Sequence, residues 1–183
     1  MAKCPQPLAS EDTRSAIWEQ LHLNFNTTAS FNKWRDKADV CPYCLQVPDD
    51  AMHLIFICPF VRSLWRDIHP ILETIHSAPL TYYEMAFGFN GLTAPVLLRN
   101  WLTFKFRQVI SFQEYMAHNN PSLNNTGMIK ESMNRVIKTE VHAKYEYCCA
   151  TNTLSFFHKH YQCVPNFVVI CPDNLGVIKV FNW

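Results

Sequence analysis

The chain has 183 residues, and its 16 lysines and arginines against 15 aspartates and glutamates give a formal charge of +1, which excludes a strong general attraction to nucleic acid or to a membrane surface. Hydrophobic residues make up 49% of the sequence, which is enough to bury a core. Four glycines against eleven prolines favour helices interrupted by prolines over a glycine-rich nucleotide-binding sheet.

Residues 10–23, SEDTRSAIWEQLHL, predict a helix with Ser10 or Asp12 at its N-cap. The polar residues 24–40 predict a turn and a short helix. Because the first twenty residues contain no continuous apolar stretch, we expect an intracellular protein, cytoplasmic or nuclear. Thiols stay reduced in those compartments, so the eight cysteines favour metal binding over disulfides.

Three cysteines and a histidine follow with the spacing C-x2-C-x8-H-x4-C, at Cys41, Cys44, His53 and Cys58. Zn²⁺ takes four tetrahedral ligands from thiolates and imidazoles, and three cysteines with one histidine are a standard structural set. Pro42 stiffens the turn between the first two cysteines. Asp49 or Asp50 is expected to cap a short helix that carries His53. The spacing therefore predicts a zinc knuckle.

The second half of this cluster needs a break in the helix. His53 and Cys58 lie five positions apart, about 140° around an ideal helix, so they do not share a face. Pro59 disfavours the helical conformation for Cys58 and lets that side chain turn back toward the metal.

Two other interpretations of the cluster remain open. The cysteines could be inert buried thiols, or Cys41 and Cys44 could be a redox pair, although the βαβ context of such a pair is absent. A zinc site with four protein ligands has no position open for water, and the sequence contains none of the common catalytic motifs. We therefore expect no enzyme activity and no small-molecule substrate.

Residues 59–68 predict a helix that begins at Pro59 and buries one apolar face, formed by Val61, Leu64, Trp65 and Ile68. Pro70 is expected to bend or end it. Residues 76–95 predict a connecting loop with a short helix.

Residues 95–118 predict a long helix, in which Arg99, Lys105 and Arg107 exclude a bilayer span. After an asparagine-rich break, residues 128–150 predict a second amphipathic helix. Its inward residues are expected to be Ile129, Met133, Val136, Ile137 and Val141.

The helical repeat of apolar residues ends before the C-terminal segment. Residues 166–171 and 176–183 are two stretches rich in β-branched residues, and the turn signal PDNL separates them. We therefore expect a mainly α fold with a short C-terminal β-hairpin, divided into a helix and zinc-knuckle region, 10–78, and a helical region, 79–183. The cysteines after residue 58 match no common metal-binding spacing, even with the nearby histidines; they are Cys148, Cys149, Cys163 and Cys171, with His158 and His160.

The stretches IWEQLH, CPYC, HLIFICPF and SLW resemble, in this order, the zinc-binding segment of LINE-type (non-LTR) retrotransposon reverse transcriptases. The resemblance covers residues 18–66 and implies that Cys41, Cys44, His53 and Cys58 are the zinc ligands. The family's polymerase aspartate pair is absent, because VPDD at 47–50 lies between ligands and follows no hydrophobic strand. The chain thus resembles the C-terminal part of such an element, without polymerase or endonuclease sites.

This resemblance implies binding to RNA or single-stranded DNA, with element RNA or target DNA as the partner. The basic residues around the knuckle suit phosphate contacts, and Trp34, Tyr43 and Phe60 lie among them to stack on bases. The predicted contacts are Lys33, Arg35, Lys37, Arg62 and Arg66.

Two alternatives to nucleic-acid binding remain. The basic residues could form a solvated face whose charge is offset by Asp36, Asp39 and Asp67. The chain could also be a zinc-stabilised protein-interaction module without nucleic-acid affinity, acting through the helices at 95–118 or 128–149.

Overall fold

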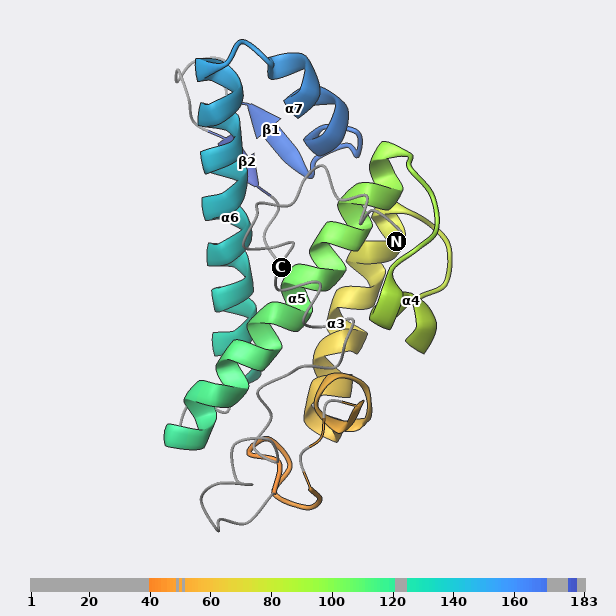
Figure 1. The fold of residues 1–183 in the computed structure, drawn as a ribbon, viewed down its shortest axis with the longest axis vertical. Coiled ribbons are helices and arrows are strands. Elements are labelled where there is room, and N and C mark those ends of the chain that lie inside the picture. Colours follow the sequence, from red (N-terminus) through yellow and green to blue (C-terminus); the bar gives the residue numbers. More distant parts are fainter. Residues whose placement is uncertain (1–39, 49, 51, 121–124, 171–177, 181–183) are drawn as a thin grey trace, which may run out of the picture.

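The computed structural model describes residues 40–170, apart from 49, 51 and 121–124, and residues 178–180 (Figure 1). The helices predicted within residues 10–40 lie outside this part of the chain. The described part is mainly helical, as expected. Its elements are, in chain order, the π-helix η1 (His53–Ile57), α3 (Pro59–Ile75), α4 (Tyr82–Phe87), α5 (Ala94–Asn119), α6 (Thr126–Ala150), α7 (Leu154–Tyr161), β1 (Val168–Ile170) and β2 (Ile178–Val180).

Helix α5 is central and contacts α3, α6, α7 and η1 (Figure 1). The strands β1 and β2 pair in antiparallel register, with Val168 opposite Val180. Residues 171–177, which would close the predicted hairpin, lie outside the described residues. The strands and α7 lie at one end of the molecule, and the segment 41–58 lies at the other (Figure 1).

Helix α3 begins at Pro59, as the sequence predicts, and buries the expected apolar face. Pro70 was expected to bend or end the helix, and it does not end it, because α3 continues to Ile75. Leu72 and Ile75 beyond the proline are buried in the core. Burial of two such side chains offsets the hydrogen bond that proline cannot donate.

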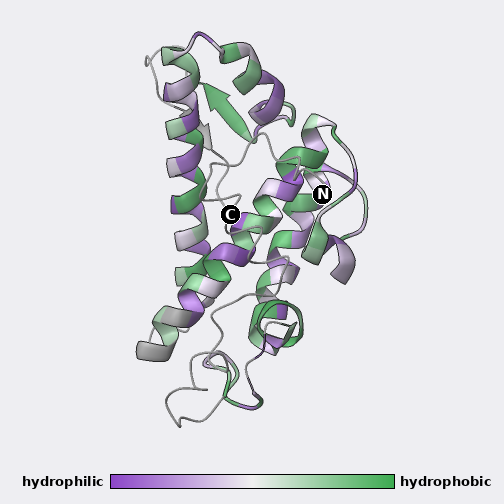
Figure 2. Cartoon of the chain, viewed as in Figure 1, coloured by the Kyte–Doolittle hydropathy of each residue, from purple (hydrophilic) through white to green (hydrophobic). Residues whose placement is uncertain are grey.

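Helices α5 and α6 correspond to the two long helices predicted from periodicity. Ile129, Met133, Ile137 and Val141 of α6 are buried as expected, and Val136 packs against them. Hydrophobic and hydrophilic residues alternate along α6 in the manner of an amphipathic helix (Figure 2). The short α4 is the helix expected within residues 76–95.

The sequence does not show that the cations of α5 are buried. Arg99, Lys105 and Arg107 are each at most 2% exposed. Figure 2 shows hydrophilic residues in the middle of α5, although α5 is the central helix. Lys105 pairs with Glu140 of α6, whereas the two guanidinium groups donate to backbone carbonyls near the ends of other helices. The buried charges therefore connect α5 to its neighbours.

A single cluster of buried side chains extends from Cys41 to Val168 and includes members from both predicted regions, 10–78 and 79–183. None of the helices in the described part is both long and apolar enough to cross a membrane.

Candidate metal centre

A tight turn places the first two cysteines. Cys41 donates its backbone N–H to the carbonyl of Val47 at 2.9 Å, and Leu45 donates to the carbonyl of Cys41 at 2.9 Å. An isolated antiparallel bridge between Val40 and Pro48 closes the turn. Leu45 has a φ of +56°, a left-handed conformation that is uncommon for a residue with a side chain. The segment thus bends back on itself and brings the cysteines to its inner side.

A π-helical turn places the other two donors. Asp50 caps the start of the turn, since its carboxylate accepts a 2.7 Å hydrogen bond from the backbone N–H of His53. Cys58 then donates its N–H to the carbonyl of His53 at 2.8 Å, which is the five-residue hydrogen bond of a π-helix. This wider turn brings residues five positions apart close together, which an ideal α-helix does not.

Cys58 leaves the helical conformation with a φ of −50° and a ψ of 124°, as expected for the residue before Pro59. The sequence predicts this extended residue and the cap at Asp50. It does not predict the π-turn, because no local residue pattern distinguishes a π-turn from an α-turn over so short a segment.

The four predicted donors come together in the fold. The donor atoms of Cys41, Cys44, His53 and Cys58 all lie within 4.8 Å of one another. The Sγ atoms of Cys41 and Cys58 are 3.9 Å apart, and Sγ of Cys44 lies 3.4 Å from Nε2 of His53. Around a tetrahedral Zn²⁺ with Zn–S bonds of about 2.3 Å and Zn–N bonds of about 2.0–2.1 Å, these separations are about 3.8 Å and about 3.6 Å. The cluster therefore has the size of a metal centre.

The burial of the cluster affects the charge of its thiols. Cys41 and Cys58 are fully buried, and His53 is 6% exposed. Hydrogen bonding to Cys58 and then burial raise the pKa of the Cys41 thiol well above its usual range. A bound cation reverses this effect, because metal coordination stabilises the thiolates that burial alone disfavours.

The side chains around the cluster connect it to the core. Tyr43 stacks on Phe60 with ring centroids 4.9 Å apart, and its hydroxyl donates to the carbonyl of Ile110. Trp65 of α3 donates its indole N–H to the carbonyl of Ile55 at 2.8 Å, which holds the π-turn on α3. The cluster is therefore part of the main core, in which Cys41 and Cys58 are themselves members.

The remaining cysteines do not form a second cluster among the described residues, where only the four donors above are grouped. Cys148 is buried and Cys149 is exposed. Cys163 donates to the backbone carbonyl of His160 at 3.3 Å, and Cys171 lies outside the described residues.

Of the predicted nucleic-acid contacts, Lys33, Arg35 and Lys37 lie outside the described residues, as does Trp34. Arg62 and Arg66 are exposed on α3, one turn apart. Within the part of the chain that the structure describes, neither forms an ion pair, and the neighbouring Asp67 of the same helix pairs with Lys130 instead. These two cations are therefore available to a ligand.

The aromatic residues predicted to stack on bases are placed differently. Tyr43 is only 8% exposed, and Phe60 is partly buried against it, so Tyr43 is a core residue and not an open stacking surface. The exposed aromatic ring that lines the same pocket as Arg62 and Arg66 belongs to Tyr82 of α4. Sequence reasoning missed Tyr82, because its position opposite α3 depends on how α4 packs on α5.

Searches with models of protein families, among curated proteins and among solved structures gave no significant match to this chain.

Proposed function

We propose that this chain is a zinc-stabilised nucleic-acid-binding module without catalytic activity, equivalent to the C-terminal part of a LINE-type reverse transcriptase. The observation that carries the proposal is the meeting of four donors, three sulfurs and one imidazole, within 4.8 Å of one another, with all but Cys44 buried. Thiolate-rich sets of this kind select zinc over magnesium, calcium or manganese. The quoted sequence motifs support the family assignment.

In this proposal the metal centre has a structural role. Four protein donors leave no position at which zinc could activate a water molecule. Cys41 and Cys44 precede the π-turn, and Cys58 directly precedes the first residue of α3. When bound, zinc would hold these segments together. Through Cys58, this would fix the start of α3, the helix that carries Arg62 and Arg66.

The nucleic-acid part of the proposal rests on these two arginines. They are exposed, close together on one helix and without an ion-pair partner among the described residues. Guanidinium groups bind phosphate with paired hydrogen bonds. Because the formal charge of the chain is only +1, we expect weak binding with little sequence preference, restricted to this local patch.

The experiment is a titration of single-stranded RNA with the zinc-loaded protein at several salt concentrations. Each phosphate contact on a single strand adds about 0.7 to the slope of log affinity against log salt. Substitution of Arg62 and Arg66 together by alanine should therefore lower that slope by about 1.4 and weaken binding.

The matched control is the double variant Arg135→Ala with Lys159→Ala, which removes the same charge from exposed positions on α6 and α7. It should change the slope much less. If the wild-type protein binds no RNA, or if both double variants bind alike, nucleic-acid binding through α3 is wrong.

The alternative function is a protein-interaction module, and exposed apolar side chains on the long helices favour it. Phe112 on α5 is 59% exposed and Met128 on α6 is 40% exposed. This alternative predicts no affinity for RNA and self-association or partner binding through these faces. Light scattering at rising protein concentration distinguishes it, because Phe112→Ser should then abolish assembly.

A further inference from the structure

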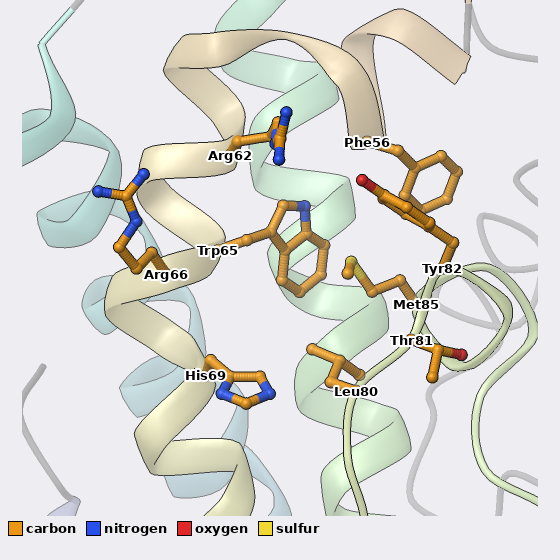
Figure 3. A pocket seen from close by; sticks show the side chains of 9 residues that line it. All are labelled: Phe56, Arg62, Trp65, Arg66, His69, Leu80, Thr81, Tyr82 and Met85. Carbon is orange, nitrogen blue, oxygen red and sulfur yellow. The ribbon is translucent and has the colours of Figure 1, made fainter.

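A pocket of about 460 Å³ lies between α3 and α4, next to the metal-binding segment (Figure 3). One wall is formed by α3 with Arg62, Trp65 and Arg66, and the opposite wall carries Tyr82 and Met85 of α4. Its volume lies within the range of about 300–1,000 Å³ that is usual for ligand sites. The pocket thus joins both arginines of the proposed interface to an aromatic wall that the sequence does not indicate.

The charge of the pocket is positive. Arg62 and Arg66 form no ion pair within the described residues, and the acidic side chains that follow them on α3 have other partners. Asp67 pairs with Lys130, and Glu73 lies 3.5 Å from His69, which also lines the pocket. An anionic ligand would therefore meet two guanidinium groups without displacing an existing partner.

The two arginines point in different directions. In Figure 3 the guanidinium group of Arg62 extends toward Tyr82, whereas that of Arg66 extends along the other side of α3. A ligand between Arg62 and Tyr82 would thus be held from both sides, while Arg66 lies where the chain of a longer ligand would continue. This arrangement suits a base in the pocket and a phosphate outside it.

The aromatic wall is held in place by packing. Tyr82 is 56% exposed and makes an edge-to-face contact with Phe56, at 6.1 Å between ring centroids and 80° between planes. Phe56 belongs to the π-turn between the metal donors, so the metal-binding segment supports the ring. Trp65 behind the pocket is buried, and its indole N–H is already bonded to the carbonyl of Ile55.

Helix α4, which carries Tyr82, is fixed on α5. Arg107 of α5 donates to the carbonyls of Met85 and Ala86, at 3.1 Å and 2.6 Å. Asn100 of α5 holds the segment after α4 through both polar atoms of its amide, which bond the N–H and the carbonyl of Phe89. The pocket is therefore bounded by elements that the core holds in position.

From this geometry we propose that the pocket binds one unpaired nucleotide of a single-stranded nucleic acid, with the base between Arg62 and Tyr82 and a neighbouring phosphate at Arg66. The inference rests on the proposed function and specifies its site. Bases stack on aromatic rings and on guanidinium planes, and such contacts are tolerant of sequence because every base has a flat face. Double-stranded nucleic acid offers no free base for this pocket.

The test compares two strands of equal length and charge, oligothymidylate of about eight nucleotides and its abasic counterpart, which keeps the phosphates and lacks the bases. A strand of this length lies within the usual range of about 4–16 nucleotides for one binding domain. The wild-type protein should bind the base-bearing strand about tenfold more tightly, because one base stacks on the ring of Tyr82.

The variants separate the base contact from the phosphate contact. Tyr82→Ala should remove the preference for the base-bearing strand and leave the affinity for the abasic strand unchanged, whereas Tyr82→Phe should keep the preference because the ring remains. Tyr83→Ala is the matched control, since Tyr83 is the next residue of α4, is 66% exposed and packs on Phe87 away from the pocket lining. It should leave both affinities unchanged.

The outcomes distinguish the inference from the function on which it rests. If both strands bind equally well to the wild type, or if Tyr82→Ala leaves the preference intact, the nucleotide pocket is refuted while phosphate binding through Arg62 and Arg66 still stands. If neither strand binds to the zinc-loaded protein, the proposed function fails and the pocket fails with it.

Discussion

The hydroxyl of Tyr43 donates a 2.8 Å hydrogen bond to the backbone carbonyl of Ile110, 67 residues further along the chain. Tyr43 lies between Cys41 and Cys44, so this bond ties the metal-binding turn directly to the central helix α5. The ring is buried and stacks on Phe60, the second residue of α3. The candidate metal centre is thereby connected to two long helices.

Tyr43→Phe should destabilise the protein by about 1 kcal/mol, because the ring stays in place and the buried hydrogen bond to Ile110 is lost. For a chain of this size that corresponds to a fall in Tm of about 2–4 °C. Thermal unfolding followed by circular dichroism measures it. The content of bound metal should not change, so loss of metal in this variant would contradict the separate roles of the Tyr43 hydroxyl and the thiolates.

Cys41→Ser should abolish metal binding in the proposed zinc centre. Native mass spectrometry of the wild type should show one zinc ion per chain. The variant should lose that ion and at least about 3 kcal/mol of stability, a small part of the roughly 10–16 kcal/mol that zinc supplies to zinc-finger peptides. Cys149→Ser is the control, because Cys149 is exposed and outside the cluster. A wild-type protein that carries no metal after purification refutes the centre.

Arg107, a buried arginine of α5, lies at the C-terminal end of α4. Arg107 donates to the carbonyls of Met85 and Ala86 near the C-terminal end of α4, where unpaired carbonyls and the helix dipole favour a positive charge. Burial lowers the pKa of Arg107 to about 10, so the group remains charged at neutral pH. It therefore caps α4 from inside the core.

Arg107→Ala should destabilise the protein by about 3 kcal/mol, since hydrogen bonds from a charged donor contribute about 1.5–3 kcal/mol and the stem also loses its packing. The stability of Arg107→Lys should lie between that of the wild type and that of Arg107→Ala. Lysine keeps the positive charge, but an ammonium group cannot reproduce the planar fork of the guanidinium. Urea unfolding of the three proteins gives the comparison. A loss below about 0.5 kcal/mol, the usual size for surface substitutions, would show that the contact is not a cap.

The sequence predicts the parts of this fold that follow from local periodicity. The apolar faces of α3 and α6 repeat at helical spacing, and Pro59 marks the start of α3 correctly. The four donors can be predicted from their spacing because Zn²⁺ limits both the type and the number of its ligands. Local rules are sufficient in these cases, since the interacting residues are close in the chain.

The features that the sequence does not predict depend on contacts distant in the chain. Pro70 stays inside α3 because Leu72 and Ile75 are buried by other elements. Tyr43 looks like a candidate for base stacking until α5 covers it, and Tyr82 becomes a candidate only when α4 packs opposite α3. Periodicity carries no information about such pairings.

His160 of α7 makes stability depend on pH. It is 7% exposed, and its Nδ1 has no hydrogen-bond partner within the described part of the chain. Burial, followed by the nearby charges of Lys159 and Lys144, lowers the pKa of His160 below its usual value. The folded protein therefore keeps this imidazole neutral when the unfolded chain already binds a proton.

As the pH falls through the unfolded pKa of about 6.5 toward the lower folded value, the unfolded state takes up the proton first, so stability decreases. A single such group contributes at most about 1.4 kcal/mol per pH unit. His160→Gln should lose this pH-dependent contribution, so the difference in unfolding free energy between the wild type and the variant should shift in favour of the variant as the pH falls from about 7 through about 6.5. Urea unfolding at several pH values measures that difference, and comparison of two proteins cancels any effect of pH on the metal centre that they share. A difference that stays constant over this range would mean that His160 does not titrate as the buried, neutral imidazole described here.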